Sequence, residues 1–203
     1  MNNPISRPVR FKSYYTSDPD DLIDCTTIWQ ACRATSAAKT FFDPMVIKGE
    51  AYSDGGCGRN NPVREVWRQA REIWRLSELQ LYQSLTCFVS IGTGVPTIPA
   101  KANDTLKDIF KLLQKIALET QDTAREFARE KIELRLAGRY YRFNVETGLY
   151  GIKLDEAAKL TQIATATREY TRTEFVKVSV MACADALAGR RYASSSDHKG
   201  RWG

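Results

Sequence analysis

Asp54 has the sequence setting most typical of catalytic chemistry in this chain. It follows the short apolar runs 45–47 and 51–52 and precedes two glycines, Gly55 and Gly56, and a strong helix start signal. Glycine permits positive φ and close approach of other groups, so we expect a sharp turn that presents the Asp54 carboxylate. Such a carboxylate can accept a proton, bind a cation or cap a backbone amide.

Four interpretations of this turn compete. A calcium loop needs oxygen ligands at alternating positions, and downstream of Asp54 only Asn60 and Asn61 supply them, at the wrong spacing. A phosphate loop needs a Gly-x-x-x-x-Gly-Lys or Gly-x-Gly-x-x-Gly pattern, which the sequence does not contain. A surface turn whose aspartate caps a neighbouring amide and a catalytic aspartate both remain open on the residues alone.

Five motifs occur in an order and spacing that resemble the patatin-like phospholipase family. They are residues 27–38, Thr-Phe-Phe at 40–42, Asp-Gly-Gly at 54–56, Asn-Asn-Pro at 60–62 and Val-Ser-Ile-Gly-Thr-Gly at 89–94. Three later stretches, 142–145, 148–149 and 154–156, resemble the fungal branch of that family. The resemblance therefore runs from about residue 7 to about residue 191, and it is to the C-terminal half of the domain.

The resemblance implies a serine acyl hydrolase that cleaves a lipid or phospholipid ester. In this family a serine on a Gly-x-Ser-x-Gly elbow attacks the ester, and the aspartate of an Asp-Gly-Gly motif is its base. A hydroxyl needs such a base to become a nucleophile, and a glycine-rich loop supplies the preorganised donors that the oxyanion needs. Asp54 matches the catalytic aspartate, and Gly55 and Gly56 complete its motif.

The sequence departs from the family in the parts that act with this aspartate. No Gly-x-Ser-x-Gly occurs in the 203 residues, and residues 54–60 imitate the oxyanion loop with Cys57 where its third glycine belongs. Ser36 lacks the flanking glycines of an elbow, so we expect it to pack or to cap a helix. We therefore expect the chain to begin within a domain and to be inactive in isolation. The alternatives are a non-catalytic pseudoenzyme or interaction fragment, and a Met1 internal to a longer reading frame.

The composition, 43% hydrophobic and 27% charged, is that of a soluble globular protein. The net charge of +6 includes a basic excess in residues 189–203. No nucleic-acid motif accompanies that charge, so we expect no nucleic-acid partner. We expect one domain over residues 7–191, a C-terminal part of a patatin-like domain, and a disordered basic tail over residues 192–203.

The cysteines and the single histidine favour neither a metal site nor a disulfide framework. The five cysteines are odd in number, widely spaced and without a Cys-x-x-Cys pair, and His198 lies in the basic tail. We expect no metal and no cofactor. The sequence contains no signal peptide and no spanning apolar run, so we expect a cytoplasmic protein with at most peripheral membrane contact.

The elements expected around Asp54 predict an α/β fold. The resemblance implies, more specifically, a partial three-layer α/β/α patatin-like fold that lacks its N-terminal strands and nucleophile elbow. Alternation predicts a strand over residues 8–15. Periodicity predicts a helix over residues 26–34 whose buried face includes Ile28, Trp29 and Cys32. A strand then leads to Asp54.

The segment after Asp54 begins with a helix start signal. Asn61 is expected as N-cap and Pro62 as the first helical residue, with both tryptophans, Trp67 and Trp74, in the core. Arg68 and Glu72 are spaced to pair along the solvated face.

The remaining elements are predicted as follows: a strand over 85–91 covered on both faces, a turn at 92–94, helices from 103 and over 123–136, a strand over 140–145, and helices over 155–173 and 174–188. Without the central strands of the sheet, exposed edges would favour self-association.

Overall fold

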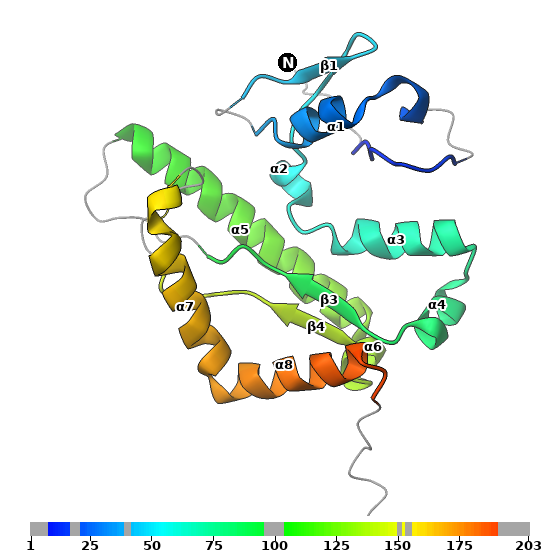
Figure 1. Ribbon diagram of the computed structural model, residues 1–203, viewed down its shortest axis with the longest axis vertical. Helices are drawn as coiled ribbons and strands as arrows, with labels where there is room; N and C mark the ends of the chain where they lie inside the picture. The colour runs from blue at the N-terminus through cyan, green and yellow to red at the C-terminus, as the bar shows by residue number, and fades with distance from the viewer. Residues whose placement is uncertain are drawn as a thin grey trace, which may run out of the picture. The chain divides into compact units, whose positions relative to one another are not determined.

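The computed structural model describes residues 8–16, 21–38, 42–95, 104–149, 152 and 156–190. The chain forms two compact units, Met1–Asn60 and Asn61–Gly203. Helices predominate over two small sheets, which confirms the helix-rich α/β class expected from the sequence (Figure 1). The predicted tail over 192–203 and residues 154–155 of the fungal-type motif lie outside the described residues. One patatin-like domain over residues 7–191 stays a prediction.

The first unit combines a short helix with a β-hairpin. Helix α1 begins after Thr27, whose backbone N–H donates to Gln30 Oε1 at 2.9 Å and so satisfies a donor at the start of the helix. Strands β1 and β2 pair antiparallel, with Met45 opposite Tyr52. The elements of this unit are η1 (Ile23–Cys25), α1 (Ile28–Thr35), β1 (Met45–Ile47), β2 (Glu50–Tyr52) and α2 (Gly56–Arg59).

The strand predicted over residues 8–15 is wrong, because the described residues 8–16 belong to neither sheet. Side chains attach this segment instead. The rings of Phe11 and Tyr52 meet edge to face with centroids 5.7 Å apart, and Lys12 Nζ lies 3.1 Å from Asp21 Oδ2. The backbone N–H and C=O groups of a strand need hydrogen-bond partners on a neighbouring strand. The alternation of residue types over 8–15 indicates a strand but does not supply that partner.

The apolar face predicted for the first helix is also not the buried one. Ile28 is 86% exposed and Trp29 63% exposed, while Cys32 is exposed. The buried side chains are Ala34 and Ala37, each 1% exposed. The helix therefore packs through its small C-terminal residues, and its large apolar side chains face away from the unit.

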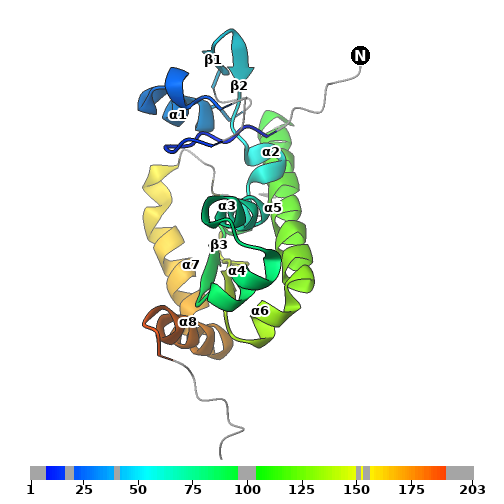
Figure 2. The same cartoon turned by 90° about the vertical axis from the view of Figure 1, so that its right-hand side faces the viewer.

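The second unit contains a βαβ arrangement, in which parallel strands β3 and β4 are connected through the long helix α5. Figure 2 shows α5 on one side of these strands and α7 on the other, so this unit is itself a small helix–sheet–helix sandwich. Its elements are α3 (Val63–Trp74), α4 (Glu78–Ser84), β3 (Phe88–Ile91), α5 (Asp104–Glu130), α6 (Ile132–Leu136), β4 (Tyr140–Phe143), η2 (Ala157–Lys159), α7 (Leu160–Arg172) and α8 (Glu174–Leu187).

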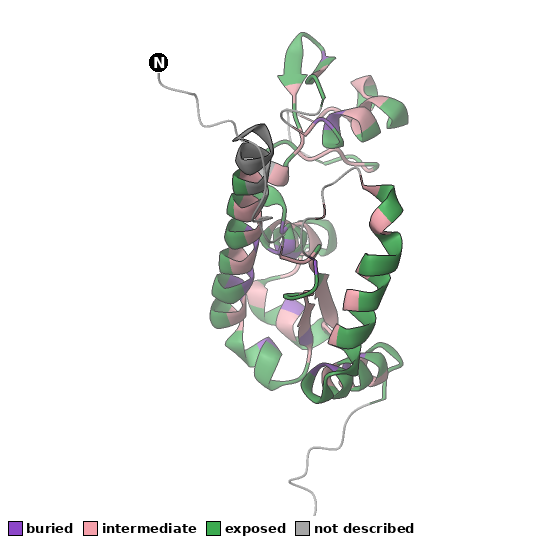
Figure 3. Cartoon of the chain, turned by 90° about the vertical axis from the view of Figure 1, so that its left-hand side faces the viewer, coloured by how far each residue is buried: buried purple, intermediate pink, exposed green. Residues whose placement is uncertain are grey.

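The core of the second unit is aromatic. Phe127 of α5 is 1% exposed, and its ring lies 5.9 Å from that of Trp67, 5.8 Å from Phe88 and 5.2 Å from Tyr140. Such edge-to-face contacts add to the stabilisation from buried area. Val63 of α3, Leu81 of α4 and Leu134 of α6 also belong to the cluster. In Figure 3, by contrast, α7 has no buried position.

Helix α3 begins at Val63, one residue after the predicted start, so its N-cap is Pro62 and not the predicted Asn61. Asn61 Oδ1 accepts from the Val63 N–H at 3.3 Å, and Asn61 Nδ2 donates to the Thr120 carbonyl at 3.2 Å. This buried asparagine therefore connects α3 to α5, because both ends of its amide are used.

Two predictions for the rest of α3 are wrong. Trp67 is in the core, but Trp74 is 60% exposed. Arg68 pairs with Glu65 rather than with Glu72, which accepts from Gln69. The i,i+3 and i,i+4 partners on a helix are equally close, so spacing alone does not choose between them.

Two further corrections concern element boundaries. The predicted helices from 103 and over 123–136 are one helix, α5, followed by the short α6. No glycine or proline lies between residues 104 and 130 to interrupt it.

Strand β3 begins at Phe88 rather than at residue 85, and Ile91 is 77% exposed. The strand is half-buried, not covered on both faces. The strand over 140–145 is β4, two residues shorter than predicted, and the helices over 155–173 and 174–188 are confirmed as η2 with α7, and as α8.

Candidate active site around Asp54

A tight hairpin places the chain before Asp54. The two residues between β1 and β2, Lys48 and Gly49, have φ of 50° and 82°. Two consecutive positive φ values are typical of the two-residue turns whose twist matches antiparallel strands. Ile47, at the end of β1, is 3% exposed. The hairpin therefore has one buried anchor and a fixed register, and Asp54 follows it by two residues.

Asp54 is held through both its backbone and its side chain. Its N–H donates to the Ala37 carbonyl at 3.0 Å, which ties the turn to the segment after α1. Its Oδ1 accepts the Gly56 N–H at 3.0 Å. Among the described residues, the Gly56 N–H is the hydrogen-bond donor to this carboxylate. The other oxygen, Oδ2, therefore remains able to accept a proton. The residue is half-buried.

The geometry of the turn also agrees with the simpler of the two open interpretations, a surface turn with a capping aspartate. A surface turn with a capping aspartate predicts a carboxylate bond to an amide two residues on, and the Gly56 amide makes it. The same bond fixes the orientation of the carboxylate, as a base requires. Geometry alone is therefore compatible with both roles.

The two glycines after Asp54 differ from the sequence-based expectation in their backbone conformation. Gly55 has φ of −69°, and neither Gly55 nor Gly56 is among the glycines with positive φ. The chain enters the helical turn α2 there, so no left-handed residue is needed until Gly58, with φ of 91°. A Cβ on Gly56 would lie 3.4 Å from Asp54 Oδ2, whereas a Cβ on Gly55 would lie 3.8 Å from Arg59 Cβ. Gly56 thus keeps the space beside the carboxylate open.

Ser36 has the helix-capping role expected from the sequence. It is the C-cap of α1, it is exposed, and its hydroxyl donates to the Cys32 carbonyl at 2.8 Å. The same carbonyl also accepts the Ser36 backbone N–H at 3.1 Å, so backbone and side chain of Ser36 both bond to the end of the helix.

The Gly92–Gly94 segment belongs to the second unit, whereas Asp54 belongs to the first. Gly94 has φ of 91°, and its N–H donates to Asn144 Oδ1 at 3.0 Å. A Cβ on Gly92 would lie 2.0 Å from the same oxygen, and one on Gly94 would lie 2.0 Å from Leu149 Cδ1. The glycines are required by packing against residues 144–149, which is the strand-end role expected from the sequence.

Sequence reasoning missed a polar group on the two parallel strands. Arg142 Nη1 donates to Ser90 Oγ at 2.8 Å, and burial lowers the pKa of this guanidinium from its ordinary value. Burial also raises the pKa of Tyr140 on the same strand. The strand register, which places Ser90 opposite Arg142, would have been needed to find this pair.

The described residues contain no group of three or more His, Cys, Asp or Glu side chains placed to hold a metal ion. Of the helices in that part of the chain, none combines the length and apolar character needed to cross a bilayer.

Comparisons with known proteins cover the segment that carries Asp54. Residues 4–67 match the family model described as patatin-like phospholipase. The chain is 30% identical over 130 residues to phospholipase A I of Arabidopsis thaliana, a match covering 64% of this chain and 9% of that protein. It is 29% identical over 143 residues to calcium-independent phospholipase A2-gamma of Oryctolagus cuniculus, covering 67% and 16%.

The counterpart from Rattus norvegicus is 28% identical over 162 residues, covering 76% of this chain and 19% of the relative. The chain thus spans less than a fifth of the length of these curated relatives. No solved structure matches it significantly.

Proposed function

Since the family model and the curated relatives support the patatin-like phospholipase family, we propose that this chain carries the base of a serine–aspartate lipid acyl hydrolase, and that Asp54 is that base. The observation that carries the proposal is the Asp54 turn, which lies within the matched residues 4–67 and leaves Oδ2 available. The substrate class is a glycerolipid or phospholipid ester, as the names of the relatives indicate for those proteins.

In the proposed mechanism, Asp54 Oδ2 takes the proton of a serine hydroxyl as the oxygen attacks the ester carbonyl. The carboxyl then returns that proton to the leaving alcohol. Water hydrolyses the acyl-enzyme in the same way, with Asp54 again as base. The Gly56 amide, bonded to Oδ1, keeps the carboxylate oriented through both steps. No histidine and no metal takes part.

The 203 residues contain no Gly-x-Ser-x-Gly motif to supply the nucleophilic serine. We therefore propose that the chain corresponds to the C-terminal half of the domain, of the fungal type, and that it does not turn over by itself. Loss of the nucleophile of a serine hydrolase typically costs roughly a millionfold in rate. A cytoplasmic location is likewise a proposal, supported by the four described cysteines being free thiols.

The test has two arms. The 203-residue chain is incubated with phospholipid vesicles, and fatty acid release is expected to stay at the background level. The reading frame upstream of Met1 is then expressed in frame with the chain. A Gly-x-Ser-x-Gly encoded there is expected to give release that Asp54→Asn abolishes.

Asp43→Asn is the matched control, because Asp43 is an exposed carboxylate of the same unit. It is expected to retain full activity. Release by the 203-residue chain that depends on Asp54 would refute the proposed inactivity, and an active longer protein insensitive to Asp54→Asn would refute the proposed base.

A second candidate function, a non-catalytic interaction fragment, is favoured by exposed apolar side chains. Ile28 and Trp29 in the first unit and Ile91 on β3 in the second are more than half exposed. In the described residues β3 pairs with β4 alone, so its other edge is open. We propose self-association through that edge. Light scattering at increasing concentration should reveal oligomers, and a monomer throughout would exclude this candidate. Peripheral membrane contact would appear as cosedimentation with vesicles.

A further inference from the structure

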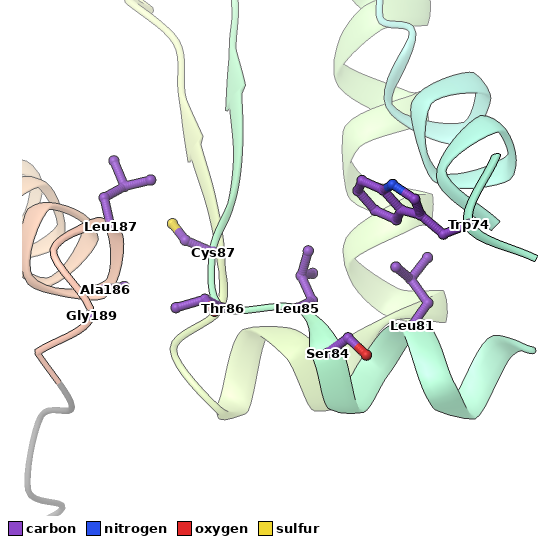
Figure 4. A pocket seen from close by; sticks show the side chains of 9 residues that line it. All are labelled: Trp74, Leu81, Ser84, Leu85, Thr86, Cys87, Ala186, Leu187 and Gly189. Atoms are coloured by element: carbon purple, nitrogen blue, oxygen red, sulfur yellow. The ribbon is translucent and has the colours of Figure 1, made fainter. Parts of the chain in front are cut away.

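Two cysteines distant in sequence lie together in the second unit. Cys87 immediately precedes β3, and Cys183 lies on α8, 96 positions later. Their sulfur atoms are 4.0 Å apart. Figure 4 shows the Cys87 side chain directed from the strand towards α8 and Leu187. The pairing was not expected from the sequence, because only the parallel register of β3 and the packing of α8 create it.

The two thiols differ in access. Cys183 is 6% exposed. Cys87 is half-buried and lines a cavity of about 370 Å³, together with Leu81 and Leu85 on one side and Leu187 of α8 on the other. A small molecule can therefore reach Cys87 through this cavity, whereas Cys183 is buried and does not line it.

We propose that Cys87 and Cys183 are an oxidation site, which a low-molecular-weight disulfide converts into an intramolecular disulfide between β3 and α8. Cys87 attacks the small disulfide as a thiolate, forms a mixed disulfide and releases one thiol. Cys183 then attacks the Cys87 sulfur and releases the second thiol. The two protein thiols lose two protons and two electrons in total, and the small disulfide gains both and becomes two thiols.

The geometry requires a small movement. A disulfide has its sulfurs about 2.05 Å apart, so the two atoms, now 4.0 Å apart, must approach by about 2 Å.

The surroundings make the reaction slow. Burial, followed by the adjacent Cys183, raises the pKa of Cys87 to about 11. Since the thiolate is the reactive form, exchange at neutral pH proceeds far more slowly than at the exposed Cys32. The pair therefore responds to sustained oxidation and not to brief exposure.

The Cys87–Cys183 disulfide would attach α8, a helix with few buried side chains, to β3. Val176 and Cys183 are the buried residues of α8, whereas Phe175 is 80% exposed and Leu187 65% exposed. A bond to β3 closes a long loop and removes conformational freedom from the unfolded chain. The oxidised form should therefore melt higher than the reduced form.

The experiment uses the whole chain in a variant that keeps only this pair, Cys25→Ser, Cys32→Ser and Cys57→Ser. The variant is incubated with oxidised glutathione at low protein concentration. Intact mass is expected to fall by two hydrogens, and digestion without reductant should give a peptide linking Cys87 to Cys183. The melting temperature should rise by roughly 5–15 °C and return on reduction.

The matched control adds Cys87→Ala, which leaves the buried Cys183 as the only thiol, so oxidised glutathione should produce neither the loss of two hydrogens nor the rise in melting temperature. Absence of the linked peptide after prolonged incubation would overturn the proposal. A linked form that melts below the reduced form would overturn the stabilising role of the bond.

Discussion

The backbone N–H of Asp54 donates to the carbonyl of Ala37 over 3.0 Å, so the turn with the carboxylate is attached to the segment that ends α1. Ala37 is 1% exposed. The position of Asp54 therefore depends on a residue 17 places earlier with no polar side chain.

Ala37→Leu should destabilise the first unit by about 1–3 kcal/mol, because three added carbons must enter a filled site. The same change should displace the Asp54 turn. Ala51→Leu is the control, because Ala51 is exposed on β2, and it should have little effect. Urea denaturation measures both, and equal destabilisation would contradict the proposed role of the Ala37 contact.

Gly56→Ala should lower the activity of the longer enzyme more than Gly55→Ala does. The methyl group at 56 would lie 3.4 Å from Asp54 Oδ2, the proposed proton acceptor, whereas the methyl at 55 faces Arg59. Neither position has positive φ, so both variants should fold. Fatty acid release at saturating substrate compares them, and a larger loss for Gly55→Ala would argue against Oδ2 as the acceptor.

Acid should weaken the second unit through Glu78. Burial opposes ionisation of this carboxyl, but hydrogen bonds from Lys131 and Trp67 and the nearby Arg71 outweigh it, so its pKa is lowered. A lowered folded-state pKa stabilises the protein above the unfolded-state pKa, and this contribution is lost as the pH falls through both values.

The free energy of unfolding should therefore decrease from about pH 5 towards pH 3. Glu78→Gln should flatten that decrease, while Glu146→Gln, at an exposed position, should not. Guanidinium titrations across this range provide the measurement. An unchanged slope in Glu78→Gln would show that other carboxylates dominate.

Phe127→Ala should cost about 3–5 kcal/mol, because it empties the centre of the aromatic cluster. Leu118→Ala removes a side chain that is 58% exposed on the same helix and should cost well under 1 kcal/mol. Denaturant unfolding followed by tryptophan fluorescence distinguishes them, since Trp67 contacts Phe127. Similar costs would mean that the cluster is not the core.

Much of the local structure could be predicted from the sequence. The start signal at Asn61 and Pro62 and the periodicity of α3 depend on nearby residues, and α3 begins within one residue of its expected start. The strand around Phe88 and the capping role of Ser36 were found for the same reason.

Several of the misses depend on partners distant in sequence, whereas the pairing of Arg68 with Glu65 and the φ of Gly55 are local. The alternation over residues 8–15 had no neighbouring strand, and the exposure of Ile28 and Trp74 depends on what packs against each helix. The Cys87–Cys183 pair and the Ser90–Arg142 bond need the parallel register. At the candidate site, a turn at Asp54 with a carboxylate–amide bond was among the sequence-based interpretations, and the Gly56 amide makes that bond, but the bond to Ala37 was not expected.

The parallel pairing of β3 and β4 also constrains the order of folding. Ser90 lies opposite Arg142, 52 positions later, with α5 in between. Closing so long a segment costs entropy before any strand contact compensates it, so the helix must condense first and bring the strands together. During synthesis on the ribosome, β3 must therefore wait, unpaired, until β4 has emerged, and this interval is when the nascent chain is most open to a competing strand from another molecule.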